Sequence, residues 1–116
     1  MRILVTGSRD SKDRDSVFSA LDKVHALRGI TLIIEGGQTG CDTFAREWAE
    51  SRGICCKTEE ADWNRYGRAA GPRRNAEMLK KWQPHGVVAF PGGKGTRDMC
   101  KRAENAGLTP WKPKGF

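Results

Sequence analysis

The sequence predicts an α/β fold: a Rossmann-like, doubly wound sheet of about five mainly parallel strands, with helices on both faces. Two observations predict it. Short apolar runs alternate with helix-periodic segments along the chain, and glycine-rich turns follow three of those runs. Helices that connect parallel strands cover both sheet faces, so such strands are almost continuously apolar. With 116 residues and no linker or repeat, we expect a single domain, residues 1–116.

The first half of the chain is expected to form three strands and two helices. Val17, Leu21 and Val24 recur at helical spacing after the first strand, and Gly29 ends that helix. A second helix ends at Gly53, and a longer polar segment, residues 59–71, follows the third strand. The predicted strands of this half are residues 2–6, 31–35 and 54–58.

The second half is expected to contain two more helices and two more strands. Pro72 is favoured at the first position of a helix, because the N–H that proline lacks would have no partner there. An apolar strand at residues 86–90 follows, and the next helix ends at Gly107. A short last strand at residues 108–111 contains Pro110, which is tolerated at the edge of a sheet.

Composition excludes several classes of protein. No apolar run is long enough to span a membrane, and the four cysteines lack the spacing of a zinc site or a disulfide framework. We therefore expect a cytoplasmic protein without membrane contact, metal or cofactor. The net charge of +7 and the pI of about 9.6 favour an anionic partner. A nucleotide is the favoured partner, and a nucleic acid is the less favoured one.

The glycine-rich turns predict an anion-binding site. All of them follow strands, and in parallel sheets ligands bind beyond the carboxyl ends of the strands. Glycine lets backbone N–H groups approach a phosphate, and the first N–H groups of the next helix point the same way. Alternatively, these turns contain glycine only for its backbone angles. The expected ligand-binding residues are Gly7, Ser8, Arg9, Gly36, Gly37, Gly40, Asp42, Arg74, Asn75, Pro91, Gly92, Gly93, Lys94, Gly95 and Thr96.

Several side chains beside these turns have both a structural and a ligand-binding interpretation. Ser8 is either a turn residue or a phosphate ligand, and Arg9 is either solvated or a phosphate ligand. Asp42 and Thr96 each stand where they can cap a helix or contact the ligand. Arg74 lies in the first turn of a helix, where the dipole disfavours a cation, so we expect a phosphate or an acidic side chain beside it.

The aromatic residues have similar alternatives. Trp63 and Tyr66, in the polar segment, are able to stack on a nucleobase, but we favour packing of Trp63 onto the core. The residues that we expect to pack in the core are Trp48, Trp82, Met99 and Cys100.

Taken together, these motifs resemble the SLOG superfamily of Rossmann-like domains. The chain is most similar to its small YspA-type, cpYpsA-related proteins, which are common in bacteria and phages. The resemblance implies a site for a nucleotide or nucleotide derivative at the glycine turns. It is carried by residues 5–9, 36–42, 61–63, 70–78 and 90–96.

Two wider relatives sharpen this expectation. Lonely-Guy phosphoribohydrolases carry a Pro-Gly-Gly-x-Gly-Thr-x-x-Glu motif whose glutamate acts with an arginine of the neighbouring helix. Residues 91–96 match that motif and Arg74 resembles the arginine, but Met99 stands at the glutamate position. The other relative, DprA, processes DNA.

We therefore expect a domain that binds a nucleotide derivative: a sensor, a sequestering protein or a degenerate enzyme. One alternative is a nucleotide-processing hydrolase of the phosphoribohydrolase type with a relocated carboxylate, because a thioether supplies neither charge nor a base. A second alternative is a nucleic-acid-binding module. Asp98 adjoins Met99 but lies about 100° away around the helix. The candidate catalytic residues are Arg74, Asp42, Asp62, Glu77 and Asp98.

The resemblance also implies a homodimer, because relatives with this architecture usually pair through helices that border the cleft. The helices that contain Trp48 and Trp82 are the expected source of apolar surface for that contact.

Overall fold

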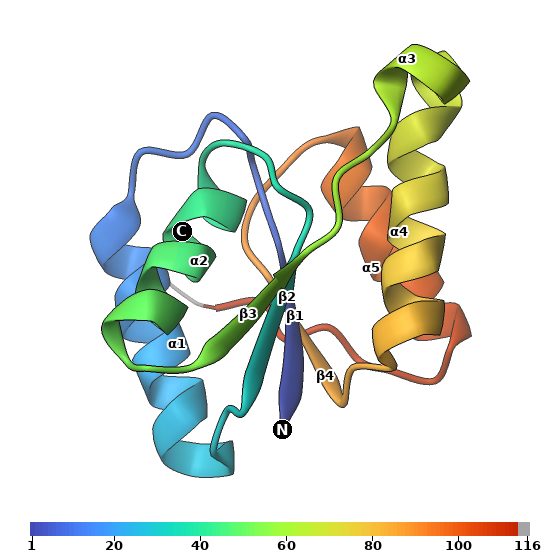
Figure 1. Cartoon of the computed structure of the whole chain (residues 1–116). Coiled ribbons are helices and arrows are strands. Elements are labelled where there is room, and N and C mark those ends of the chain that lie inside the picture. The colour runs from blue at the N-terminus through green and yellow to red at the C-terminus, as the bar shows by residue number, and fades with distance from the viewer. Residues whose placement is uncertain (114–116) are drawn as a thin grey trace.

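The computed structural model describes residues 1–113 and contains a four-stranded parallel sheet with helices on both faces (Figure 1). The sheet order is β3-β2-β1-β4. Because successive strands are added first on one side of β1 and then on the other, the order reverses between β1 and β4. The strands are β1 (Arg2–Thr6), β2 (Leu32–Glu35), β3 (Cys55–Thr58) and β4 (Gly86–Ala89).

The expected fifth strand is reduced to one bridging residue. Trp111 donates its N–H to the carbonyl of Val87, and its own carbonyl accepts from the N–H of Ala89, both at 2.8 Å. Leu108 is not available for pairing, because its N–H closes the end of the preceding helix on the Ala103 carbonyl. Pro110 has no N–H to donate. The predicted strand over residues 108–111 is therefore wrong except at Trp111.

Within residues 1–113, four helices have two turns or more; three of them connect successive strands and the fourth follows β4. Asp13 caps α1 (Arg14–Arg28) by accepting the N–H of Ser16 at 3.1 Å, and Gly29 ends the helix with a φ of 69°. None of the described helices combines the length and the apolar character needed to cross a membrane. The other three of these long helices are α2 (Cys41–Ser51), α4 (Ala70–Trp82) and α5 (Lys94–Asn105).

The polar segment after β3 contains more structure than the sequence suggests. It forms a single-turn helix, α3 (Trp63–Tyr66), and a 3₁₀ turn, η1 (Gly67–Ala69). Asp62 caps α3 by accepting the N–H of Arg65 at 3.1 Å. This local hydrogen bond stabilises the single turn of α3, which lies at the top of the molecule beside the start of α4 (Figure 1).

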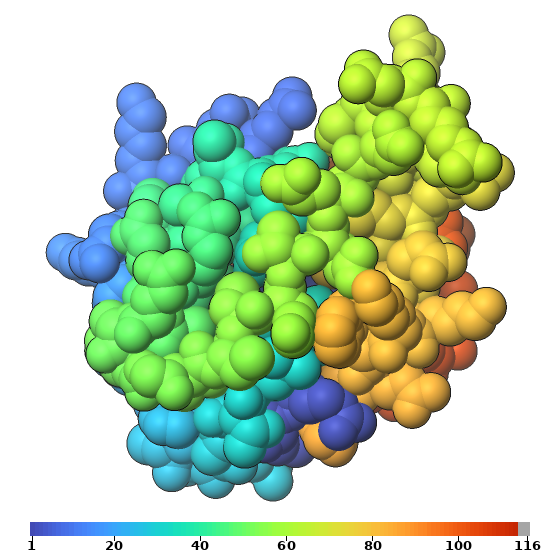
Figure 2. All heavy atoms as spheres, viewed as in Figure 1, coloured from blue at the N-terminus to red at the C-terminus, as the bar shows by residue number. Residues whose placement is uncertain are grey.

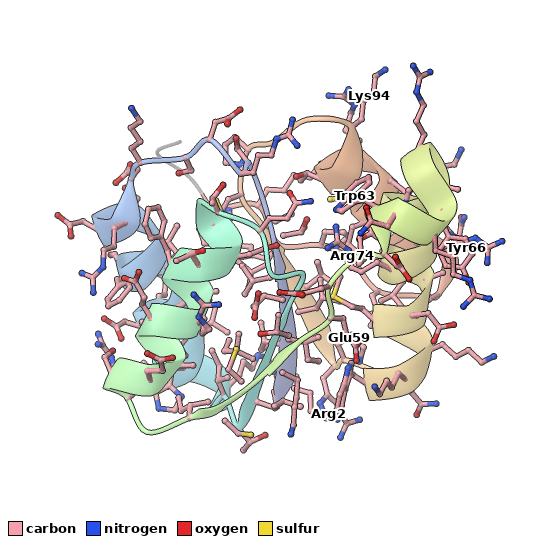
Figure 3. All side chains as sticks on the ribbon, turned by 45° about the horizontal axis from the view of Figure 1, so that its top comes forward. Arg2, Glu59, Trp63, Tyr66, Arg74 and Lys94 are labelled. Atoms are coloured by element: carbon pink, nitrogen blue, oxygen red, sulfur yellow. The ribbon has the colours of Figure 1, made fainter. Side chains whose placement is uncertain are left out.

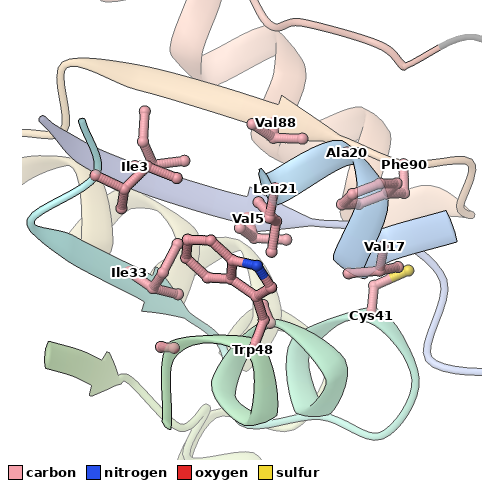
Figure 4. Close-up of a cluster of buried hydrophobic side chains, with 13 residues drawn as sticks. Ile3, Val5, Val17, Ala20, Leu21, Ile33, Cys41, Trp48, Val88 and Phe90 are labelled. Atoms are coloured by element: carbon pink, nitrogen blue, oxygen red, sulfur yellow. The ribbon is translucent and has the colours of Figure 1, made fainter. Parts of the chain in front are cut away.

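The sheet separates two apolar cores. On the face covered by α1 and α2, Trp48 is fully buried and packs among residues that include Leu21 and Ile33 (Figure 4). On the face covered by α4 and α5, Met78 and Met99 pack against residues of the central strands. The predictions that Trp48, Met99 and Cys100 are core residues are confirmed, and Trp82 is partly buried against the second core.

Burial of Trp48 changes the expected dimer surface. The indole N–H of Trp48 donates to Asp22 at 2.9 Å, and none of the side chain reaches solvent. Trp48 therefore supplies no apolar surface to a partner. The large apolar side chains that are exposed among the described residues are Leu27, Trp63 and Trp111.

Candidate functional site

A cavity of about 690 Å³ lies at the carboxyl ends of β1 and β2 and at the N-terminal ends of α4 and α5. This is the edge of the sheet at which the sequence places the glycine turns, next to the point where the strand order reverses. Its volume is in the range of small-molecule sites, roughly 300–1,000 Å³. The predicted residues that line it are Gly7, Ser8, Arg9, Gly36, Asp42, Arg74, Asn75, Gly93, Lys94, Gly95 and Thr96.

The remaining predicted residues shape the loops without lining the cavity. Gly40 has a φ of 73° and lies so close to the first loop that a Cβ there would overlap the Ser8 carbonyl oxygen. The Ser8 N–H donates to the Pro91 carbonyl at 2.9 Å. Ser8 therefore ties the loop after β1 to the loops after β2 and β4. The predicted residues that do not line the cavity are Gly37, Gly40, Pro91 and Gly92.

The start of α5 presents unpaired donors to the cavity. Gly93 is the N-cap and provides no side-chain cap, and the N–H groups of residues 94–96 donate to no group within residues 1–113. Thr96 lines the same cavity, and its side chain does not cap the helix. Of its two predicted roles, capping is therefore wrong. Such a cluster of N–H and O–H donors at a helix N-terminus favours an anion.

Ser8 has the turn role that the sequence allows, and it also lines the cavity. Its hydroxyl accepts the N–H of Asp10 at 3.0 Å, which stabilises the loop after β1. Arg9 is exposed at the cavity rim, and among the described residues its guanidinium has no ion pair or hydrogen-bond partner.

Arg74 is held by oxygen atoms of neutral groups. Its Nη1 donates to the Gly36 carbonyl at 2.7 Å, and its Nε donates to the side-chain oxygen of Asn75 at 3.0 Å. A Cβ at Gly36 would lie 2.5 Å from Nη1, so the glycine makes this approach possible. Burial lowers the pKa of the Arg74 guanidinium, while Asp42 and Glu35 raise it. Acidic side chains therefore lie near Arg74, as expected, and their charges stabilise its cationic form. Its direct hydrogen bonds, however, are to a backbone carbonyl and a side-chain amide.

Asp42 stabilises the loop after β2 and does not cap α2. One carboxylate oxygen accepts the N–H groups of Gly36 and Gln38, at 3.2 and 3.3 Å. The N-cap of α2 is Gly40, without a side-chain cap, so the capping alternative for Asp42 is wrong. Burial and, to a smaller extent, the nearby Glu35 raise the pKa of the Asp42 carboxyl to about 6, against the lowering effects of these hydrogen bonds and of Arg74.

Glu35 is the buried residue that sequence reasoning missed. It is fully buried at the end of β2, where it accepts the N–H of Gly37 at 2.6 Å and a hydrogen bond from the Thr58 hydroxyl. Charged residues are almost never fully buried unless they are paired or hydrogen-bonded. The signal in the sequence was a charged residue at the last position of an apolar strand, directly before two glycines.

The candidate catalytic residues divide into two groups. Asp98 lines the cavity and accepts hydrogen bonds from Asn75 and Arg102, each at 2.9 Å. Met99 is fully buried in the core and does not line the cavity. Neighbouring residues of a helix point in different directions. Asp98 therefore faces the cavity, whereas Met99, one residue further along α5, faces the core. Arg74 and Asp42 also line the cavity, whereas Asp62 and Glu77 do not.

Trp63 lies at the cavity and is half exposed, so the prediction that it packs onto the core is wrong. Figure 3 shows Trp63 and Arg74 on the same side of α4, toward the centre of the molecule, and Tyr66 on the opposite side. The guanidinium of Arg73 lies 4.2 Å from the centroid of the Tyr66 ring. Tyr66 therefore contacts Arg73 and does not line the cavity.

The charges at the cavity are mixed, with cations in excess. Lys94 extends outward at the start of α5 (Figure 3), and Arg68 also lines the cavity. In the part of the chain that the structure describes, none of the side chains of Arg9, Arg68 and Lys94 forms an ion pair. The cations of the lining are Arg9, Arg68, Arg74 and Lys94, and the carboxylates are Asp10, Asp42 and Asp98.

Comparison with known proteins identifies relatives. Residues 1–66 match the family described as the YspA, cpYpsA-related SLOG family. The "Gene 61 protein" of Mycobacterium phage D29 is 36% identical over 115 residues, which cover 92% of this chain and 91% of that protein. No solved structure matches. The match to the family spans the loops after β1 and β2 and ends with α3.

Proposed function

The chain belongs to the YspA, cpYpsA-related SLOG family, and from this premise we propose that it binds a nucleotide or nucleotide derivative in the cavity at the strand ends. It acts as a sensor, a sequestering protein or a degenerate enzyme. The observation that carries the proposal is the convergence of the loops after β1, β2 and β4 on one cavity with unpaired donors at the start of α5. The strand order and the helices on both faces support a doubly wound, Rossmann-like interpretation of this fold.

The phosphate of the ligand is assigned to the start of α5. There the N–H groups of residues 94–96 and the Thr96 hydroxyl supply hydrogen-bond donors, and the helix dipole adds a partial positive charge. Lys94 and Arg9, which lack ionic partners among residues 1–113, supply full charges at the rim. Backbone donors that are fixed by the fold lose little entropy when an anion binds, which favours a preformed site.

Arg74 is assigned as the side-chain clamp deeper in the cavity. Its Nη1 and Nε are engaged by Gly36 and Asn75, whereas its Nη2 forms no hydrogen bond within the described residues. The two contacts fix the plane of the guanidinium and leave the Nη2 donors for a ligand oxygen. A lysine has a single ammonium group and cannot fix itself and bind the ligand in this way.

The test compares two neighbouring arginines. A thermal-shift screen of nucleotides, cyclic nucleotides and ADP-ribose identifies a ligand, because tight binding raises the melting temperature by mass action. Calorimetry then compares wild type with Arg74→Ala, Arg74→Lys and Arg73→Ala. Loss of a charge-assisted contact costs about 1.5–3 kcal/mol, so both Arg74 variants are expected to bind roughly 10- to 100-fold more weakly. Arg73→Ala, which only frees the Tyr66 ring, is the matched control and retains wild-type affinity.

Two results would contradict the proposal. The first is wild-type affinity in Arg74→Ala. The second is a preference for polynucleotides whose affinity falls steeply with salt, because binding through many phosphates releases many counterions. That result favours the nucleic-acid-binding alternative, which the net charge of +7 motivates. A mononucleotide in a preformed cavity is expected to show a much shallower salt dependence.

The hydrolase alternative has one observation in its favour, the position of Asp98. This carboxylate lies in the cavity lining beside the turn that resembles the phosphoribohydrolase motif, where Met99 is buried. Cleavage of an N-glycosidic bond needs a carboxylate to stabilise the developing positive charge on the ribose. We expect no release of base from nucleoside monophosphates. Turnover by wild type that is lost in Asp98→Asn or Asp42→Asn would replace the sensor function with the hydrolase.

A further inference from the structure

The Trp63 side chain stands between the solvent and the cavity with most of its surface uncommitted. It is 50% exposed, although burial of an aromatic ring of this size is strongly favourable. Among the described residues, its indole N–H donates to no group and its ring has no aromatic or cationic neighbour. Trp48 and Trp82, in contrast, both donate their indole N–H groups to carboxylates.

The position of Trp63 is nevertheless fixed. Asp62 caps the single turn of α3 that carries it, and the edge of the indole lies against Gly71 in the first turns of α4. A Cβ on Gly71 would lie 3.3 Å from Cη2 and 4.0 Å from Cζ3 of Trp63. Gly71 does not have a positive φ, so its backbone does not require glycine, and glycine within a helix is unfavourable relative to alanine. The absence of a side chain there lets the ring approach α4 closely.

Trp63 also lines the same cavity as the start of α5. The cavity lining includes Trp63, Arg68, the start of α4 and the start of α5, where the phosphate is assigned. Figure 2 shows α3 and η1 as a projection at the top right of the surface. A ligand with a phosphate at α5 that fills the cavity therefore extends toward an exposed aromatic ring.

We propose that Trp63 stacks on a nucleobase, so that the ligand is a nucleotide with a planar base at the end opposite its phosphate, and not a sugar phosphate. The proposal rests on the proposed function, because it needs a phosphate at the start of α5. Every nucleobase presents a π-face, so stacking selects for a base without selecting among the bases. The exposed half of the indole is the surface that the base covers on binding.

The experiment titrates AMP, GMP, CMP, UMP and ribose 5-phosphate into wild type, Trp63→Ala, Trp63→Phe and Trp111→Ala by calorimetry. Stacking on one aromatic ring is worth about 1–3 kcal/mol, so wild type is expected to bind at least one mononucleotide roughly 5- to 150-fold more tightly than ribose 5-phosphate. Trp63→Ala is expected to lose this factor while its affinity for ribose 5-phosphate is unchanged. Trp63→Phe retains most of the factor. Trp111→Ala, which removes an exposed tryptophan outside this cavity, retains all of it.

Each contrary result has a distinct meaning. The base-stacking role is overturned if Trp63→Ala binds mononucleotides like wild type, or if wild type binds ribose 5-phosphate as tightly as every mononucleotide. It is also overturned if Trp63→Ala loses affinity equally for both classes, because Trp63 would then only shape the cavity. In these three cases the phosphate site stands. If wild type binds none of the five compounds, the inference is overturned, whereas the proposed function fails only if the wider screen of cyclic nucleotides and ADP-ribose also finds no ligand.

Discussion

Residues 1–113 enclose two large cavities that are lined by different types of residue. The cavity at the strand ends, about 690 Å³, is lined by glycine backbone, charged side chains and unpaired donors. The other, about 860 Å³, lies between α1, β4 and the segment that carries Trp111, and its lining is mainly apolar, with Met1, Val24 and Leu27. The larger cavity has few convergent polar groups. Size alone therefore does not indicate which cavity recognises a ligand, whereas convergent polar groups do.

The difference follows from how each cavity is built. At the strand ends, three loops approach one another through backbone contacts, such as the 3.1 Å hydrogen bond from the Cys41 N–H to the Ser8 carbonyl. Little space is left for side chains there, so the walls are rigid. The apolar cavity lies where, among the described residues, Trp111 continues the sheet beyond β4, and its walls are formed mainly by side chains. Substitutions in the two cavities should therefore have very different effects.

The largest expected effect is that of a single methyl group at Gly40. Its backbone angles, φ 73° and ψ −128°, are almost restricted to glycine, and a Cβ would overlap the backbone of Ser8 and Arg9. Gly40→Ala is expected to lower the free energy of unfolding by about 3 kcal/mol or more, measured in urea. The matched control is Gly86→Ala in the apolar cavity, where the Cβ lies 3.3 Å from the flexible Ile3 Cδ1, and we expect a loss below about 1 kcal/mol. Equal losses would contradict the comparison.

The next effect is a pH dependence that arises from Asp42. Asp42 is 8% exposed, and the pKa of its carboxyl is raised, mainly by burial, from 3.8 to about 6. Between these values the folded chain retains a proton that the unfolded chain has lost, so the free energy of unfolding falls as pH rises through this window. The full penalty, about 3 kcal/mol, is present above roughly pH 7 and absent below roughly pH 3.5.

The measurement compares wild type with Asp42→Asn in urea at several pH values. Asparagine keeps an oxygen acceptor for the N–H groups of Gly36 and Gln38 but does not ionise. We expect the stability of wild type to fall relative to this variant from pH 4 to pH 6.5 and then to stay constant. A difference that does not change with pH would show that Asp42 is ionised throughout.

A third effect separates ligand binding from stability. No heavy atom lies within 4 Å of a Cβ built on Gly93, so Gly93→Val meets no steric clash, but valine is a poorer N-cap than glycine, and we expect the free energy of unfolding to fall by about 1 kcal/mol or less. The valine side chain would instead occupy the space in front of the N–H groups of α5. Nucleotide affinity should fall at least tenfold, about 1.4 kcal/mol, by calorimetry. Normal binding by the folded variant would place the phosphate elsewhere.

The parts that the sequence predicted well depend on local patterns. Apolar runs and glycine-rich turns gave the first four strands, and the shared edge of a parallel sheet brought Ser8, Gly36 and Gly93 to one cavity. The family is likewise the one that the motifs predicted. These features need only the order of residues along each segment and the geometry common to parallel sheets.

The parts that it predicted poorly depend on how one element meets another. Asp42 turns back to the loop because Gly36 and Gln38 present their N–H groups to it, which no spacing reveals. Trp63 lies at the cavity because Gly71, on another helix, leaves room for its ring. The fifth strand failed because the N–H of Leu108 is used by the end of α5. Each outcome is decided by contacts between segments that the sequence does not place relative to each other.

The smallest expected effect on stability is at Leu27, and it bears on the predicted homodimer. Leu27 is 76% exposed at the rim of the apolar cavity, and Trp111, 38% exposed, lines the same cavity. With Trp48 fully buried, these two residues are the large apolar side chains available to a partner on this side of the described chain. Leu27→Gln keeps a good helix former in α1 and removes little buried area, so the free energy of unfolding should change by less than about 0.5 kcal/mol.

Self-association should respond although stability does not. We expect wild type to sediment as a dimer at micromolar concentration, and Leu27→Gln to shift toward the monomer, because a side chain at the centre of an apolar contact contributes far more to association than to the monomer fold. Glu50→Gln, on the exposed surface of α2 and away from both cavities, controls for the loss of a surface side chain. A wild type that sediments only as a monomer contradicts the dimer. A dimer that Leu27→Gln leaves intact moves the interface away from the apolar cavity, and this cavity would then have neither a ligand nor a partner to account for its exposed apolar residues.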